Sequence, residues 1–563
     1  MIFILFKIML YTLHIHKTDY TSYSLISESD KINLTEPSLI TGLFHLDKVK
    51  YSDNSIKLVE RNLPKFIVGE LELYSKYQFK PNKKGIPTYI FKPLDYRFPK
   101  FYVNSTQKTK YDSNIFITIE YVNWEEKSIF PKGNLLKIIG ANYDKSAVEE
   151  SLLLKYSLDN FNLKLDFKGI TSKFEPLILD TKNRVIVDKK IISIDPEGCK
   201  DIDDALSIML KDDILILDIH ISDVYYLLSS LDIIDKIKNS TSIYLSNTIK
   251  HMLPTIISSG LGSLIEKNNR FMLTMTIKYD INNGVLNEIV FNKTIGKITK
   301  NYNYDNYPKQ IDKYFSYIEN IYKLITKQKI KIDDSHKFIE ALMIIYNTYF
   351  CENVLNNTKL KIYRTQSKKP YIIENMDDRL GRFLKLIHSN SAIYSLDREG
   401  HATLDIDNYT HVTSPLRRLV DLMNQEIYYT NECTIMDRIS LDKINTINKN
   451  LKKYYRDIAK LSLAHDVYNS ECYETQCYIY DYNLEKGNVN LYFPKENISI
   501  KTNIINFKIY DLYTTSVERD NIIIKSKIDD SFKKIDLYKS LGVILNGKPN
   551  IYNVDKSIVF EFI

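Results

Sequence analysis

Residues 195–205 have the sequence Asp-Pro-Glu-Gly-Cys-Lys-Asp-Ile-Asp-Asp-Ala. Four aspartates and one glutamate fall within this stretch, directly after the mainly apolar run 191–194. The pattern predicts a strand that ends in a tight acidic loop. Carboxylates packed this closely repel one another, and a bound cation relieves the repulsion. Because hard ions such as Mg²⁺ prefer carboxylate oxygens together with waters and substrate phosphates, the spacing indicates a metal site that handles phosphate.

The acidic run has two plainer interpretations. A solvated surface loop is the commonest use of such a run, but largely apolar residues flank it on both sides, over 191–194 before it and over 205–210 and 214–221 after it. An EF-hand calcium loop starting at Asp201 needs an oxygen ligand at its fifth position and Gly at its sixth, where Ala205 and Leu206 occur. The flanking residues favour core strands that hold the loop rigidly.

The composition describes an ordinary globular chain of several domains. At 563 residues it is too long for one compact core, and about three or four domains are expected. Its 77 basic and 70 acidic side chains permit nucleic-acid binding without requiring it. The five Cys are scattered without zinc-ligand spacing, which predicts reduced thiols and a cytoplasmic location. Residues 1–10 are too short an apolar run to span a bilayer, so no membrane association is expected.

The periodicity predicts two β-rich parts that flank a large mixed part. Short strand-like runs separated by turn residues fill 64–140, and they return from about 475 to the end, as in small barrels. Between them the pattern is first β and then helical, with helices expected over 311–330, 338–355 and 441–468.

A second motif lies far downstream. Residues 409–421 have the sequence Tyr-Thr-His-Val-Thr-Ser-Pro-Leu-Arg-Arg-Leu-Val-Asp. Ser414 followed by Pro415 predicts a capped helix start. A helix start with hydroxyl groups and an Arg pair is a favourable anion site, because backbone N–H groups and guanidinium groups both bind phosphate. A capped surface helix without a ligand is the alternative.

Together these residues resemble the RNB exoribonuclease family, the ribonuclease II and ribonuclease R group. In that family the acidic motif is roughly Asp-Pro-x-x-Ala-Arg-Asp-x-Asp-Asp-Ala, and the later motif is roughly Tyr-Thr-His-Phe-Thr-Ser-Pro-Ile-Arg-Arg-Tyr-Ala-Asp. The resemblance covers about residues 180–425. Further family-like segments lie between the two motifs in the family's order, at 219–224, 242–245, 252–254, 262–264, 339–343 and 362–364.

The resemblance also covers the parts that flank this region. Residues 92–99 and 131–133, with Trp124, are similar to the second cold-shock barrel of eukaryotic-type members. The implied fold class is multidomain α+β, with OB-type β-barrels flanking a large α/β RNB catalytic domain. No PIN endonuclease domain precedes the barrels, so the layout is closest to the free-standing members, and a monomer is expected. The implied domains are a reduced first cold-shock barrel (1–63), a second cold-shock barrel (64–150), the RNB domain (151–470) and a C-terminal OB-type RNA-binding barrel (471–563).

The resemblance implies an activity and a set of site residues. The activity is hydrolysis of single-stranded RNA from its 3′ end to nucleoside 5′-monophosphates, with Mg²⁺ as the cofactor and Mn²⁺ as the alternative ion. Asp203 and Arg417 are the implied catalytic residues: Asp203 holds an ion or orients the attacking water, and Arg417 neutralises charge on the scissile phosphate. The implied metal ligands are Asp195, Asp201, Asp203 and Asp204. The implied RNA-binding residues are Tyr244, Tyr304, Arg364, Arg418 and Lys200.

Two of the positions that depart from the family pattern bear on the site. Lys200 occurs where the family has Arg, which keeps the charge and loses the planar bidentate geometry. Tyr455 falls about where a family glutamate near the leaving nucleotide is expected. Neither change removes an implied metal ligand. The alternative functions are a catalytically weak or inactive RNA-binding protein on the same scaffold and, against the domain order, a DNase.

Overall fold

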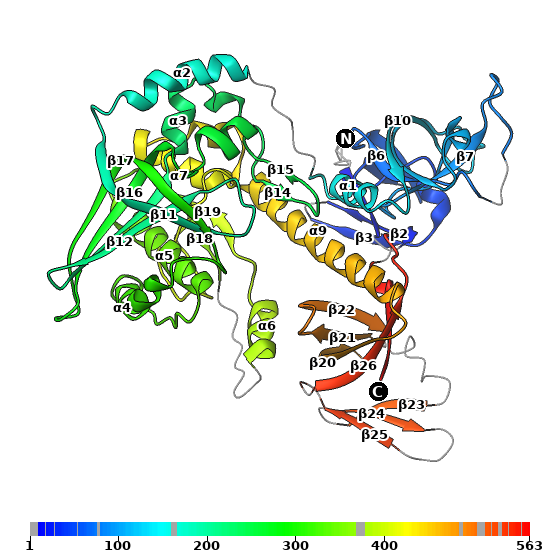
Figure 1. Ribbon diagram of the computed structural model, residues 1–563. Helices are drawn as coiled ribbons and strands as arrows, with labels where there is room; N and C mark the ends of the chain where they lie inside the picture. The colour runs from blue at the N-terminus through cyan, green and yellow to red at the C-terminus, as the bar shows by residue number, and fades with distance from the viewer. Residues whose placement is uncertain are drawn as a thin grey trace, which may run out of the picture. The chain divides into compact units, whose positions relative to one another are not determined.

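The computed structural model describes residues 10–562, apart from 17–18, 28, 53, 76–78, 159–165, 368–377, 484–487, 504–512, 519–520, 527–531, 537, 539 and 553. The chain forms two compact units, and each is described by itself (Figure 1). One unit comprises residues 160–449. The other comprises residues 1–159 together with 450–563.

Five strands of the 160–449 unit close into a barrel in the order β11-β12-β13-β16-β17. β11 runs parallel to β17, and the other neighbours are antiparallel. On β13 the side chains of Leu215, Leu217, Ile219 and Ile221 are fully buried. The strands expected on both sides of the acidic loop are thereby confirmed. The barrel strands are β11 (Val185–Asp195), β12 (Asp204–Lys211), β13 (Ile214–Ser222), β16 (Asn269–Asp280) and β17 (Val285–Asn303).

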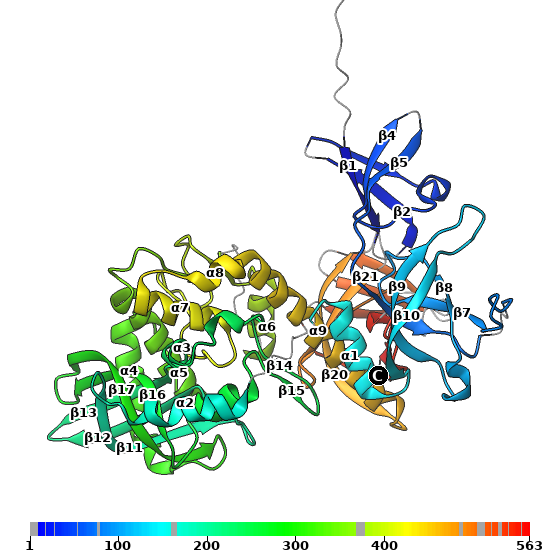
Figure 2. The ribbon, with the colours of Figure 1, turned by 90° about the horizontal axis from the view of Figure 1, so that it is seen from above.

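Most helices of this unit share one continuous hydrophobic core with the barrel (Figure 2). The expected helix over 441–468 is confirmed to the residue, and the one expected over 338–355 is divided into α5 and a π-helical turn, Phe350–Val354. The helices are α2 (Phe167–Leu179), α3 (Val224–Ser230), α4 (Phe315–Thr326), α5 (Ser335–Tyr349), α6 (Asp378–His388), α7 (Leu419–Thr430) and α8 (Thr434–Arg438). A further helix, α9 (Leu441–Tyr468), begins in this unit and continues past Lys449 into the other. Two small antiparallel sheets pair β14 (Ile243–Tyr244) with β15 (Ile249–Lys250) and β18 (Tyr363–Thr365) with β19 (Ile393–Ser395).

The helix of the second motif begins later than the sequence predicts. α7 starts at Leu419 with Arg418 as its N-cap, whereas the sequence pattern places Ser414 at the cap. The reason is tertiary. The Ser414 N–H donates to Oδ1 of Asp421 at 2.7 Å, and the Ser414 carbonyl accepts from the N–H groups of Arg417 and Arg418. Residues 414–418 therefore form a tight turn ahead of the helix.

The other unit begins with two β-rich parts. The first is an open five-stranded sheet in the order β3-β2-β1-β4-β5, and the second is a closed barrel in the order β10-β8-β7-β6-β9, followed by α1 (Lys145–Lys155). The sheet strands are β1 (Leu10–His16), β2 (Asp19–Ile26), β3 (Lys31–Leu34), β4 (Lys48–Ser52) and β5 (Ser55–Glu60). The barrel strands are β6 (Ile67–Leu71), β7 (Thr88–Pro93), β8 (Phe101–Asn104), β9 (Ile115–Asn123) and β10 (Lys132–Ala141).

Phe44 joins the first sheet to the barrel that follows it. Its side chain is fully buried in the barrel core, where its ring stacks on Phe101 with 6.2 Å between centroids. The Arg61 guanidinium lies 4.8 Å from the centre of the Phe44 ring. A side chain from the first sheet therefore completes the core of its neighbour.

The chain ends in two further sheets within this unit. The larger has the strand order β22-β21-β20-β26-β27, and the smaller has the order β23-β24-β25. Among the described residues the first and last sheets do not close, so barrels at these two places stay predictions. No helix in the described part of the chain is both long and apolar enough to cross a membrane. The strands are β20 (Tyr473–Asn483), β21 (Asn488–Phe493), β22 (Ile498–Asn503), β23 (Tyr513–Glu518), β24 (Asn521–Ser526), β25 (Phe532–Asp536), β26 (Ser540–Gly547) and β27 (Ile558–Phe562).

Candidate active site

The acidic loop connects two barrel strands. Asp195 is the last residue of β11 and Asp204 is the first of β12, so both lie at the same end of the barrel. Ser263 holds the loop between them: its hydroxyl donates to the Lys200 carbonyl at 2.7 Å and accepts from the Ile202 N–H at 2.9 Å. Arg270 in turn donates to the Ser263 carbonyl at 2.6 Å. The loop is thereby fixed to the barrel from outside its own sequence.

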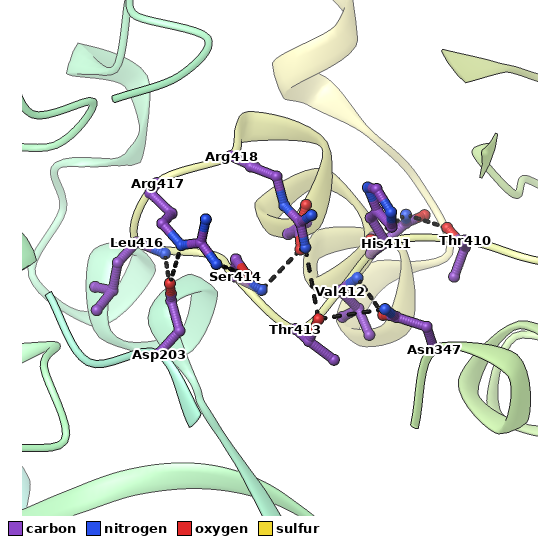
Figure 3. A network of polar contacts seen from close by, with 12 residues as sticks. Asp203, Asn347, Thr410, His411, Val412, Thr413, Ser414, Leu416, Arg417 and Arg418 are labelled. Atoms are coloured by element: carbon purple, nitrogen blue, oxygen red, sulfur yellow. Dashed lines mark hydrogen bonds and ion pairs between the residues drawn. The ribbon is translucent and has the colours of Figure 1, made fainter. Parts of the chain in front are cut away.

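Asp203 connects the acidic loop to the second motif (Figure 3). Its Oδ2 accepts from Nε of Arg417 at 2.9 Å, and its Oδ1 accepts from the Leu416 N–H at 2.8 Å. The Asp203 side chain is 2% exposed, whereas that of Arg417 is 42% exposed. Arg417 therefore neutralises a buried carboxylate and still presents part of its guanidinium to a ligand.

A polar network holds the loop that carries Arg417 (Figure 3). Nη2 of Arg417 donates to the Ser414 hydroxyl at 2.9 Å, and Arg418 donates to Asp421 at 2.7 Å. Asn347, on α5, accepts from the Val412 N–H at 2.9 Å through its Oδ1. Two helices thus fix the position of Arg417. Sequence reasoning missed the roles of Ser263 and Asn347, because these residues act through contacts distant in sequence. It also missed the role of Asp421, whose contacts with Ser414 and Arg418 lie within the motif.

The acidic loop is electrostatically unbalanced. Burial raises the pKa of Asp203 to about 7, against the opposing effect of Arg417. Burial also raises the pKa of Asp195 to about 6, and Asp201 adds to the rise. The pKa of Asp204 is raised well above its usual value by burial and by the charges of Asp195 and Asp203. One arginine beside several buried carboxyl groups leaves negative charge that a cation would relieve.

Tyr244 touches the acidic loop directly. Its phenol donates to Oδ2 of Asp201 at 2.6 Å, and burial together with this bond raises the tyrosine pKa. Its side chain is nevertheless 39% exposed. The structure therefore brings together Tyr244, the acidic loop and Arg417, as the sequence predicts.

Tyr304 contacts the first residue of the acidic loop. It follows β17, and its backbone N–H donates to the Asp195 carbonyl at 3.2 Å. Burial, aided by the charges of Asp204 and Asp195, raises its pKa to about 12. Its ring stacks on that of His336, with centroids 3.7 Å apart and planes 22° apart. Sequence reasoning did not single out His336.

The remaining predicted site residues have more varied surroundings. Arg418 is engaged by Asp421, and the Arg364 guanidinium lies 4.4 Å from the centre of the Tyr394 ring. Lys200 is exposed on the acidic loop. The contacts of all three with RNA stay predictions. The role of Tyr455, which belongs to the other unit, also stays a prediction.

The donors at this site fit a hard cation in their chemistry. They are carboxylate oxygens, and Oδ2 of Asp195 is buried without a hydrogen-bond partner among the described residues. Asp201 and Asp203 are each engaged by another side chain. As they lie, no three His, Cys, Asp or Glu side chains of the described ranges are grouped closely enough to hold a metal ion.

Comparison with known proteins agrees with this geometry. The RNB domain family matches residues 184–324 and 309–431, and the Dis3-like cold-shock domain 2 (CSD2) matches residues 88–157. Ribonuclease R of Ureaplasma parvum is 25% identical over 500 residues, which cover 71% of this chain and 66% of that protein. The exosome complex exonuclease dis3 of Schizosaccharomyces pombe is 28% identical over 240 residues, 40% of this chain and 24% of that protein. The matched stretches thus span less than two thirds of these relatives.

Two solved structures share the fold. Mycoplasma genitalium RNase R in complex with ribose methylated single-stranded RNA has a TM-score of 0.72 at 16% identity, covering 98% of this chain and 100% of that one. Yeast Ssd1, described as a pseudonuclease, has a TM-score of 0.66 at 12% identity, covering 98% of this chain and 96% of that one.

A barrel whose end carries four aspartates, one of them paired with an arginine from a distant loop, defines an acidic centre with the donor chemistry of a hard-cation site. The chain contains an RNB domain and a Dis3-like cold-shock domain. The resemblance and the fold class expected from the sequence are confirmed.

Proposed function

We propose that the chain is a 3′-to-5′ exoribonuclease that hydrolyses single-stranded RNA to nucleoside 5′-monophosphates, with Mg²⁺ as its cofactor and Mn²⁺ as the alternative. One observation carries the proposal: Asp203, between Asp201 and Asp204, is paired with the partly exposed Arg417. A chain that had lost catalysis would gain stability by replacing these buried carboxyl groups. The exonuclease relatives support the same reaction class.

The four aspartates and Arg417 have different roles in the proposed hydrolysis. Asp195, Asp201 and Asp204 would hold the cation, which supplies charge neutralisation at the attacking and leaving oxygens. Asp203 accepts hydrogen bonds at both oxygens, and each oxygen keeps a lone pair that accepts from the attacking water. Arg417 donates to the scissile phosphate, where negative charge develops as water attacks. Asp203 keeps the guanidinium oriented toward that phosphate.

The aromatic residues supply binding without sequence preference. Tyr244 is a partly exposed residue beside the acidic loop, and Tyr304 is bound to the first residue of that loop through its backbone. Stacking tolerates any base, because every base has a π-face. Single-stranded RNA is therefore the proposed substrate. The cytoplasmic location and the monomeric state stay predictions.

An inactive RNA-binding protein is the second candidate function. Two observations favour it: yeast Ssd1, a pseudonuclease, shares the fold, and no metal-ready group of three side chains is found in the described residues. Against it, all four aspartates and Arg417 are retained. The two candidates differ in one measurable property, the shortening of RNA.

The decisive experiment uses 5′-labelled single-stranded RNA and DNA of matched sequence, each with Mg²⁺ or with EDTA. Wild-type protein should shorten the RNA to products of a few nucleotides only with Mg²⁺, and Asp203→Asn should reduce the rate by at least about 100-fold. Asp213→Asn, in the exposed turn between β12 and β13, is the matched control and should retain full activity. RNA that stays intact under all conditions contradicts the enzyme, and equal decay of DNA contradicts the RNA specificity.

A further inference from the structure

His336 is an exposed residue in the first turn of α5, and its ring lies face to face with that of Tyr304. The centroid separation of 3.7 Å and the angle of 22° leave no space for a base between the two rings. One face of Tyr304 is therefore covered. A base that approaches from that side meets the imidazole and not the phenol ring.

The Tyr304–His336 pair is fixed at the acidic loop. The Tyr304 N–H donates to the carbonyl of Asp195, and the hydroxyl of Ser335 donates to the carbonyl of Tyr304 at 2.8 Å. The start of α5 is therefore attached to the residue that follows β17. The charges of Asp195 and Asp204 act on the Tyr304 phenol, which places the pair beside two of the predicted metal ligands.

The His336 side chain is accessible on one face of its ring. Its side chain is exposed although one ring face rests on Tyr304. Within the part of the chain that the structure describes, its ring nitrogens have no hydrogen-bond partner. The ring is thus positioned by stacking rather than by a polar network, and its outer face remains available. Aromatic side chains, His included, are the usual stacking partners of unpaired RNA bases.

We propose that Tyr304 and His336 form a two-ring shelf, and that a base near the 3′ end of bound RNA stacks on the outer face of His336. The inference rests on the proposed function and assigns a positioning residue to it. In this shelf the Tyr304 ring packs against the inner face of His336, and His336 makes the contact with RNA. A base stacked on His336 lies one stacking layer farther from Tyr304 than a base stacked on Tyr304 itself. The shelf thereby sets how close the RNA end comes to the acidic loop.

The test measures stacking directly, with 2-aminopurine placed in turn at each of the last four positions of a single-stranded RNA, in EDTA. Stacking quenches 2-aminopurine fluorescence, and wild-type protein should quench it strongly at one of these positions. His336→Leu keeps Tyr304 covered but removes the aromatic face; alanine would expose Tyr304 to the base. We expect His336→Leu to abolish the strong quenching at that position and to weaken RNA binding at least about five-fold.

His336→Phe is the conservative variant and should restore both the quenching and the affinity. His465→Leu, at an exposed histidine of α9 that contacts Asp466 and Asn469, is the matched control and should change neither. Full quenching by His336→Leu overturns the shelf, and so does a His336→Phe protein that stays as weak as His336→Leu. Wild-type protein that neither binds nor shortens RNA overturns the proposed function and the shelf with it; RNA shortening with an unchanged His336→Leu overturns the shelf alone.

Discussion

The phenol of Tyr244 donates to Oδ2 of Asp201 at 2.6 Å, across 43 residues of sequence. Tyr244 is the residue expected to hold the terminal nucleotide, and Asp201 is an expected metal ligand. The ring is 39% exposed while its hydroxyl is committed to the carboxylate. This hydrogen bond therefore joins a predicted RNA-binding residue to a predicted metal ligand. Binding of RNA and binding of the cation should be coupled, and such coupling is reciprocal.

Tyr244→Phe separates the two roles of this side chain. The variant keeps the ring for stacking and loses the hydrogen bond that orients Asp201. Loss of one such bond should weaken cation binding about two- to tenfold. Mn²⁺ binding followed by electron paramagnetic resonance should show this weakening, while RNA affinity in EDTA stays unchanged. Tyr11→Phe, which loses a tyrosine–aspartate bond of 3.1 Å in the other unit, is the control. Unchanged Mn²⁺ binding would show that Tyr244 does not position Asp201.

The raised pKa values of Asp195, Asp203 and Asp204 predict how stability depends on pH. Their pKa values are higher in the folded than in the unfolded chain, so folding takes up protons. This contribution is complete below about pH 4, the ordinary aspartate pKa, and is lost as the pH rises through about 6 to 7. In EDTA, the Tm should therefore fall by at least about 2–4 °C between pH 5.5 and pH 8.

Mg²⁺ should reverse this loss of stability. The ion competes with protons for the same carboxyl groups, so the rise in Tm on adding Mg²⁺ should be larger at pH 8 than at pH 5.5. Asp195→Asn should reduce both the pH dependence and the effect of Mg²⁺. Differential scanning fluorimetry at the two pH values measures both. An equal Mg²⁺ effect at both pH values contradicts a cation site built from these aspartates.

The sequence predicted those elements of the fold that local hydrophobic periodicity determines. The acidic loop between β11 and β12 and the helix α9 follow from apolar periodicity alone. β10 (Lys132–Ala141) lies at the end of the β-rich stretch predicted over 64–140, although three register irregularities against β9 break its alternation of buried and exposed residues. The start of α7 was placed too early, since the Ser414 N–H is bound by Asp421 and the turn at Ser414 is set by tertiary contacts.

The candidate site was likewise predicted only in part from the sequence. Its aspartates share one loop, and a motif identifies them together. The partners that orient them come from distant segments: Tyr244 reaches Asp201 and Arg417 reaches Asp203. The stack of Tyr304 on His336 joins the end of β17 to the start of α5. No periodicity within one segment reveals such contacts, because the barrel and not the local sequence creates them.

Arg417→Lys tests whether guanidinium geometry is needed for catalysis. Arg417 donates through Nε to Asp203 and through Nη2 to Ser414, and a lysine ammonium cannot hold both directions and also reach the phosphate. The kcat should fall about 100-fold, while RNA affinity in EDTA changes little, because charge is kept. Arg438→Lys is the control: Arg438 donates to the backbone carbonyls of Asp235 and Ile234. Equal losses of kcat and RNA affinity would indicate a binding role instead.

Lys200→Ala tests the residue at which the acidic loop departs from the family pattern. The Lys200 carbonyl is held by Ser263, whereas its side chain is exposed and, in the described residues, has no ion-pair partner. Removal of one phosphate contact should therefore leave the loop and its cation requirement intact and weaken RNA binding through charge alone. The slope of log Kd against log salt should fall by about 0.7, the value for one contact to a single strand. Lys211→Ala, at the opposite end of β12, should leave the slope unchanged. A changed Mg²⁺ requirement in Lys200→Ala, with an unchanged salt slope, would assign Lys200 to the shape of the loop and not to RNA.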